Sequence, residues 1–160
     1  MKIQLAAVLL GMGLCCAFNS AMCSEKADSV ERAARVMIKD NIVLVRSFVQ
    51  YFDNATNEHW YTHGRDYLVK FNIHDREARA LFNKDGRLVY SILFGTEKNL
   101  PDDIRYEVRS NYFDYHITKT SEVKEAGRII WVIDMINDEK HLTLRVENNE
   151  MEEVLKFIKD

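Results

Sequence analysis

Histidine is the residue of this chain best suited to metal binding or to proton transfer. The five histidines are His59, His63, His74, His116 and His141. His59 and His63 stand four residues apart, and a strand would place both side chains on one face. Four residues of strand span roughly 13 Å, which is too far for both to bind one metal ion through bonds of about 2 Å. We therefore predict surface or edge histidines and no metal site.

The motifs that mark common catalytic centres are missing from the sequence. It contains no Gly-x-Ser-x-Gly elbow, no phosphate-binding glycine loop and no His-Glu-x-x-His helix. Its carboxylates stand mostly in predicted turns and on predicted helix faces beside Lys or Arg, which is typical of a solvated charged surface. These observations predict a protein that is not an enzyme, with no catalytic residue and no cofactor.

Aromatic side chains on predicted strands are the remaining candidates for contact with a partner. They are Trp60, Tyr61, Tyr67 and Tyr90. Adjacent residues of a strand face opposite ways, so either Trp60 or Tyr61 should reach a surface, where large aromatics often anchor partners. The structural alternative is that Trp60 and Tyr67 pack against a helix while Tyr61 covers a sheet edge. Trp131 is expected in the core.

The first 23 residues have the three parts of a secretory signal peptide. A basic start is followed by an apolar run over residues 3–14 and then by small and polar residues. The apolar run is too short to span a bilayer, which takes about 20 residues. Cleavage after Ala17, Ala21 or Cys23 would each leave a small residue beside the cut, and the choice among them stays open.

All cysteines of the chain fall in or beside this segment, as Cys15, Cys16 and Cys23. A lipid-bearing cysteine normally follows a small residue, whereas these follow Leu14, Cys15 and Met22. Lipid anchoring is therefore the less favoured alternative. The mature chain keeps one cysteine or none, so it can form no internal disulfide and depends on its core for stability.

The composition of residues 24–160 fits one exported domain. The formal net charge of the chain is −3, and Lys and Arg are spread along it rather than clustered, which disfavours binding of nucleic acid. No later segment is long and apolar enough to predict a membrane span. We expect a periplasmic or secreted protein, and the sequence leaves its oligomeric state open.

Helical spacing of apolar residues predicts the helices of the mature chain. Residues 24–40 indicate a short helix or a loosely held leader. The next helix is capped by Asp40 or Asn41, and its predicted inner stripe is Val45, Phe48, Val49 and Phe52. A later helix begins at Pro101, where a missing N–H costs nothing, with the stripe Ile104, Val108 and Tyr112.

Alternating apolar residues predict strands after each helix, separated by turn residues. The predicted strands are 67–73, 78–82, 88–93, 117–123, 129–135 and 142–146. Residues 41–94 and 99–160 then read as two repeats, which predicts an α+β fold: a tandem duplication of a helix followed by an antiparallel β-meander, with the helices packed on a curved antiparallel sheet. Residues 151–158 fit either a helical stripe or a last strand, and the repeat favours the strand.

Short motifs in a fixed order also carry a family resemblance. They are Phe48 with residues 51–55, then 60–61, 67–71, 80–86 and 100–101, then Ile104, Val108, Tyr112 and Tyr115. In this order the chain resembles the beta-lactamase-inhibitor-like, PepSY-like family of exported bacterial proteins. The resemblance implies a tandem α/β unit with a helix-backed curved sheet and no catalytic centre. It assigns no functional residues.

The leading hypothesis is a non-catalytic binding or inhibitor-type module that presents one sheet face to a protein or peptide outside the cytoplasm. The alternative is a periplasmic carrier of haem, a lipid or a metal, held in apolar space between the helices and the sheet. A hydrolase is the third hypothesis, and it would require polar groups that converge in a pocket.

Overall fold

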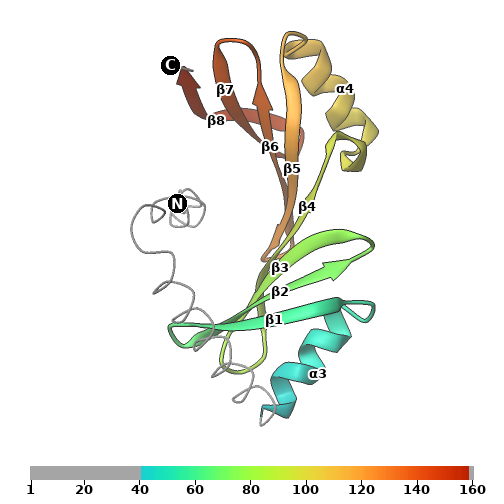
Figure 1. Cartoon of the computed structure of the whole chain (residues 1–160), viewed down its shortest axis with the longest axis vertical. Helices are drawn as coiled ribbons and strands as arrows, with labels where there is room; N and C mark the ends of the chain where they lie inside the picture. Colours follow the sequence, from blue (N-terminus) through green and yellow to red (C-terminus); the bar gives the residue numbers. More distant parts are fainter. Residues whose placement is uncertain (1–40, 159–160) are drawn as a thin grey trace, which may run out of the picture.

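The computed structural model describes residues 41–158, which form eight strands, two α-helices and one short 3-10 helix (Figure 1). In chain order these are α3 (Ile42–Tyr51), β1 (Thr56–His63), β2 (Asp66–Ile73), β3 (Arg76–Phe82), β4 (Leu88–Gly95), η1 (Glu97–Asn99), α4 (Asp102–Asn111), β5 (His116–Glu125), β6 (Arg128–Ile136), β7 (Lys140–Glu147) and β8 (Glu150–Ile158). The signal peptide, all three cysteines and the leader over residues 24–40 lie outside the described residues.

The ends of both α-helices have local causes that the sequence carries. The Asn41 side chain accepts a hydrogen bond from the backbone N–H of Leu44 at 3.2 Å, which confirms Asn41 as the cap of α3. Pro101 stands directly before α4, as expected. Acidic residues in the first turn of α4 and Arg109 in its last turn complement the helix dipole.

Tight turns between the strands use residues that tolerate a positive φ. His74 and Asp75 have φ values of 50° and 58°, and Asn148 and Asn149 have values of 51° and 63°. Gly86 takes a φ of +77°, and a Cβ built there would stand only 3.1 Å from side-chain atoms of both Val43 and Ser47. The β3–β4 turn can therefore pack directly against α3 because Gly86 has no side chain.

All eight strands join one antiparallel sheet in the order of the chain, from β1 to β8. Strands make up 57% of the described residues and helices only 19%, so the predicted fold of tandem helix-and-meander repeats is wrong. The decisive pairing is β4 with β5, which runs from Tyr90 opposite Glu125 to Gly95 opposite Thr120. Similar local patterns in two segments say nothing about this long-range pairing, which is why the sequence led to the wrong fold class.

The last segment is a strand. Residues Glu150–Ile158 form β8, and β8 pairs antiparallel with β7 along its length, from Lys140 opposite Ile158 to Glu147 opposite Glu150. The helical alternative for this segment is therefore wrong. Apolar residues at helical spacing were misleading here because β8 exposes residues on both of its faces, including Val154 and Leu155.

Both α-helices cover the same face of the sheet. Residues that pair across neighbouring strands share a face, and Ala78 pairs with Leu93, Leu93 with Glu122, and Glu122 with Trp131. Ala78 belongs to the core cluster under α3, and Trp131 belongs to the core cluster under α4. Figure 1 accordingly shows α3 and α4 on one side of the strands. We call the opposite side the open face, since no helix of residues 41–158 packs on it.

The core under α3 is built mainly from aromatic rings. Phe48 is 1% exposed, and its ring centroid lies 5.2 Å from that of Trp60, 5.1 Å from that of Phe71 and 6.2 Å from that of Phe82. These distances fall in the range of favourable edge-to-face contacts. Small residues of β3, such as Ala80, leave room for the rings.

The predicted inner stripe of α3 is partly wrong. Leu44 and Phe48 are the buried residues of this helix, whereas Val45 is 38% exposed and Val49 is 52% exposed. Apolar residues cover well over half of the circumference of α3, with Arg46, Ser47 and Gln50 on the remaining side, so spacing alone could not identify which part of the apolar surface meets the sheet.

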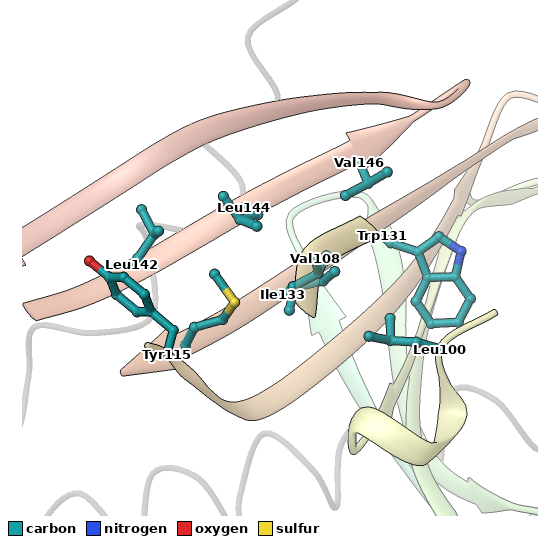
Figure 2. Packing of buried hydrophobic residues seen from close by; sticks show 9 residues of the cluster. Leu100, Val108, Tyr115, Trp131, Ile133, Leu142, Leu144 and Val146 are labelled. Atoms are coloured by element: carbon teal, nitrogen blue, oxygen red, sulfur yellow. The ribbon is translucent and has the colours of Figure 1, made fainter. Parts of the chain in front are cut away.

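The core under α4 is mainly aliphatic (Figure 2). Val108 of α4 is 1% exposed and packs with residues of β6 and β7. The buried members of this cluster are Leu100, Val108, Tyr115, Trp131, Ile133, Met135, Leu142, Leu144 and Val146. Trp131 is 8% exposed, so its predicted core position is confirmed.

Candidate functional site

The structure separates the four predicted contact residues into two pairs. Trp60 is 5% exposed inside the α3 core, and Tyr67 is half-buried against the same cluster. Tyr61 and Tyr90 lie on the open face and are also half-buried. Trp60 and Tyr67 therefore serve packing in this fold, whereas Tyr61 and Tyr90 lie on the face that no described helix covers.

Tyr61 and Tyr90 stand at the two ends of one row across β1–β4. Tyr61 pairs with Leu68, Leu68 pairs with Leu81, and Leu81 pairs with Tyr90. All four side chains are half-buried. Directly paired residues on one face have Cβ atoms about 5 Å apart, so the four side chains touch or nearly touch. We call this set the aromatic row.

Cations stand over aromatic rings beside this row. The Lys70 Nζ lies 5.0 Å from the centre of the Tyr61 ring. The Phe94 ring has the Arg79 guanidinium carbon at 5.0 Å and the Lys119 Nζ at 4.4 Å. These distances are within the 6 Å or so over which a ring attracts a cation. We call these five residues the cation–aromatic region.

Arg76 holds the end of β4 that carries Phe94. Its Nε donates to the Phe94 carbonyl at 2.8 Å, and its Nη2 donates to the Leu93 carbonyl at 3.3 Å. Burial lowers the pKa of Arg76, and the nearby Glu122 carboxylate acts in the opposite direction. The guanidinium remains charged and fixes the backbone from which the Phe94 ring projects.

An open hollow of about 430 Å³ adjoins the cation–aromatic region on β1–β3. The side chains that line it on the open face come from Asn57, His59, Lys70, Asn72, Glu77 and Arg79. Two cations, one carboxylate and several neutral polar groups thus surround one depression. This chemistry suits a polar or acidic group from another molecule.

On the part of the open face formed by β5–β8, arginine and glutamate side chains form ion pairs with one another. Arg128 pairs with Glu125 at 3.1 Å and with Glu147 at 3.5 Å. Arg145 pairs with Glu147 and reaches Glu152 at 3.9 Å. We call these five residues the ion-paired region. Its three glutamates outnumber its two arginines, so it offers no net attraction to an acidic partner.

A buried apolar strip joins the two regions. Val123, Ile130 and Val132 form a small cluster on the open face, and Ile92 of β4 packs against it. Ile130 is fully buried and the other two are 7% exposed, although no described helix covers them. The strip keeps the middle of the open face apolar and firmly packed.

The surroundings of Tyr90 keep its hydroxyl neutral. Burial raises the pKa of Tyr90, and the nearby Glu125 carboxylate raises it further, whereas Arg79 lowers it. Because the net direction is upward from an ordinary value near 10, Tyr90 is a neutral hydrogen-bonding aromatic at physiological pH. This property fits a binding residue.

The described residues form no group of three or more metal-ligating side chains. His59 and His63 share one face of the edge strand β1, as their pairing with Lys70 and Asp66 shows. No helix among residues 41–158 is long and apolar enough to cross a membrane.

Sequence reasoning missed most of the open face. In β2, Leu68 and Lys70 alternate with the buried residues and therefore face away from the core. In β4, Phe94 lies on the same face as Tyr90 and Ile92, because it follows them at two-residue spacing. This two-residue spacing could have identified the residues of the open face once the strands were known. The contact between Lys119 and Phe94 had no signal in the sequence, because it depends on the pairing of β4 with β5.

Comparison with solved structures identifies the fold. A BLIP-like protein from Bacteroides fragilis matches with a TM-score of 0.60 and 15% identity, over 70% of this chain and 84% of that chain. A DUF2874 family protein from Bacteroides uniformis has a TM-score of 0.60 and 10% identity, over 73% of this chain and 88% of that chain. A candidate periplasmic protein from Bacteroides eggerthii has a TM-score of 0.60 and 12% identity, over 73% and 87%.

At these identities the likeness shows a shared fold. The first neighbour agrees with the beta-lactamase-inhibitor-like part of the sequence resemblance, and the PepSY-like part stays a prediction. The third neighbour agrees with the expected location outside the cytoplasm. No protein-family model and no curated protein sequence matches the chain.

Proposed function

We propose that this chain is a non-catalytic module that works in the periplasm or after secretion and binds a protein partner through its open face. The observation that carries the proposal is the aromatic row, a line of half-buried side chains on a sheet face that no described helix covers. Rigid aromatic side chains on a firm support are the residues that most often dominate binding energy.

Three further observations support this function. The chain begins with the three parts of a signal peptide. One structural neighbour is described as BLIP-like and another as a candidate periplasmic protein. The open face brings together aromatic, aliphatic and cationic groups, a composition that fits recognition better than group transfer.

The size of the open face indicates how much of it a partner would use. Four strands of about eight residues, at about 3.3 Å per residue and about 4.8 Å between strands, present roughly 500 Å², and eight strands present roughly 1,000 Å². A stable interface usually buries about 800 Å² on each partner. A partner centred on the aromatic row would therefore also cover the apolar strip and part of β5 and β6.

The alternative of a small-ligand carrier has less support. A carrier of haem or lipid would need space between the helices and the sheet. That space holds the two packed core clusters, in which Phe48, Ile133 and Leu144 are all at most 1% exposed.

Alanine substitution of the row tests the proposal. The purified chain is used to capture a partner from periplasmic extract or culture medium of the cells that export it, and saturable binding is then measured by surface plasmon resonance. Tyr61→Ala with Tyr90→Ala is expected to weaken binding at least tenfold, since a buried aromatic hot spot contributes about 2 kcal/mol or more. The thermal midpoint should change little.

Tyr106→Ala on α4 is the matched control, since Tyr106 is 76% exposed and lies on the helix-covered side. The control should bind as the unchanged protein does. Unchanged affinity of the double variant, or no saturable capture by the unchanged protein, would contradict the proposal.

A further inference from the structure

The cations at the two ends of the open face have different contacts. In the ion-paired region, Arg128 and Arg145 are neutralised by glutamates of the same chain. In the cation–aromatic region, Lys70 and Lys119 stand over rings instead, and neither belongs to an ion pair within the described part of the chain. A ring attracts a cation but leaves its formal charge in place, so Lys70 and Lys119 keep their positive charge.

The hollow beside this region is large enough to receive a side chain. Lys70 and Arg79 line it from β2 and β3, and Glu77 is its one lining carboxylate. Its volume of about 430 Å³ lies in the ordinary range for pockets that hold part of another molecule. Two cations and one carboxylate thus line the hollow, so an entering carboxylate would meet two positively charged donors.

The cations are also held in place before anything binds. The Tyr61 ring positions the Lys70 ammonium at 5.0 Å, and the Phe94 ring positions the Arg79 guanidinium at the same distance. A carboxylate that arrives between them would meet donors that have already lost part of their rotational freedom. Charge-assisted hydrogen bonds from Lys and Arg to a carboxylate are about twice as strong as neutral ones.

We propose that the partner places an acidic side chain in this hollow, from a protein segment in which Asp or Glu stands next to apolar residues. The proposal rests on the function proposed above and adds the chemistry of the partner. A protein segment is favoured over a small free acid because the aromatic row lies beside the hollow, two residues further along each strand, and offers apolar contact across β1–β4. The apolar neighbours would lie on this row while the carboxylate enters the hollow.

A library of random twelve-residue peptides displayed on phage provides the probe. The purified mature chain is used for selection, and the recovered peptides are sequenced and synthesised. Selected peptides are expected to be enriched in Asp and Glu next to Leu, Val or aromatic residues. Their affinity should fall at least tenfold between 50 mM and 500 mM salt, because salt screens the attraction between exposed charges.

Paired substitutions on both molecules isolate the contact. Lys70→Gln with Arg79→Gln should weaken binding of the acidic peptide about tenfold, and so should replacing the peptide's acidic residue by Gln. Combining both changes should add little further loss, which is the sign of a direct interaction in a double-mutant cycle. Lys84→Gln with Lys98→Gln is the matched control, since both lysines are exposed and lie outside the open face.

The outcomes separate this inference from the proposed function. Peptides that depend on Tyr61 and Tyr90 but show no acidic enrichment would overturn the acidic partner and leave the binding face intact. Peptides whose affinity ignores the aromatic row would overturn both. Additive losses in the double-mutant cycle would also contradict a carboxylate in the hollow.

Discussion

The half of the sheet formed by β1–β4 and the half formed by β5–β8 each carry one ten-residue helix on the same face, yet they differ on the open face. In the first half, cations stand over Tyr61 and Phe94 beside a hollow. In the second half, Arg128 and Arg145 form ion pairs with glutamates of the same chain. In both halves the covered face packs a core against one helix. The two halves differ on the open face, where only the first combines cation–aromatic contacts with a hollow.

The two cores are packed with different side chains. Rings of Phe48, Trp60 and Phe82 fill the space under α3, and aliphatic residues such as Leu144 fill most of the space under α4. A larger anchor residue buries more apolar area, so α3 depends on a few rings while α4 shares its burial among smaller residues.

The two helix anchors should differ in their contribution to stability. Phe48→Ala should lower the free energy of unfolding by about 4 kcal/mol, because it removes a ring that contacts four others and leaves a cavity. Val108→Ala in α4 removes two methyl groups and should cost about 2 kcal/mol. Urea titration of each variant followed by circular dichroism measures both values.

Val49→Ala is the control for α3, because Val49 is 52% exposed and the change should stay within about 0.5 kcal/mol. Equal losses for the Phe48 and Val108 variants would mean that the two cores anchor their helices equally, which contradicts a stronger dependence of α3 on a few rings.

The open face should show a smaller difference in stability between its two ends. Arg145→Gln removes the partner of Glu152 and one of the two partners of Glu147, and it should cost about 1 kcal/mol because the Glu147 side chain is only 12% exposed. Lys70→Gln removes only a contact with the Tyr61 ring and should cost about 0.5 kcal/mol. Thermal unfolding at low and at 0.5 M salt checks this prediction.

High salt should reduce the cost of Arg145→Gln more strongly, because that cost comes from interactions between charges. A larger loss for Lys70→Gln than for Arg145→Gln would show that the cation over the ring has a structural role and would weaken the functional reading.

The smallest predicted effect concerns the ion pair that ties α4 to η1. Arg109 donates to Glu97 at 2.6 Å and 2.7 Å, and this hydrogen bonding holds the pKa of the Glu97 carboxyl below its ordinary value. A depressed folded-state pKa stabilises the protein above the unfolded-state pKa, and the benefit is lost as pH falls through the folded value. Both side chains are partly exposed, so Glu97→Gln should cost only about 0.5 kcal/mol at pH 7.

The pH dependence provides the check for this pair. The difference in unfolding free energy between Glu97→Gln and the unchanged protein should vanish once the pH is below the lowered pKa of Glu97. A difference that persists in acid would show that the substitution acts through packing and not through the charge of the carboxylate.

Local chemistry made several features predictable. Asn41 and Pro101 mark helix starts because a cap or a missing N–H acts within one turn. Gly86 and the pair Asn148–Asn149 mark turns because Gly and Asn tolerate a positive φ more readily than other residues do. Tyr61 was a sound candidate for a surface position because alternation along one strand puts it opposite Trp60.

Other features were not predictable because they depend on distant partners. The prediction that Val45 and Val49 are buried was wrong, because contacts with the sheet determine which of the apolar residues of α3 face the core. The fold class was misjudged because the pairing of β4 with β5 joins two similar segments into one sheet.

The sequence by itself determined where strands alternate, where turns occur and where helices begin, since each of these depends on a few neighbouring residues. Only the tertiary structure decided which strands pair, and through that pairing which face the helices cover. Tyr61 and Tyr90 belong to one row because β2 and β3 pair between β1 and β4 in a register that puts Leu68 opposite Tyr61 and Leu81 opposite Tyr90. The reason is physical: backbone hydrogen bonds between strands form between any residues in register, so their choice depends on the burial of the whole sheet.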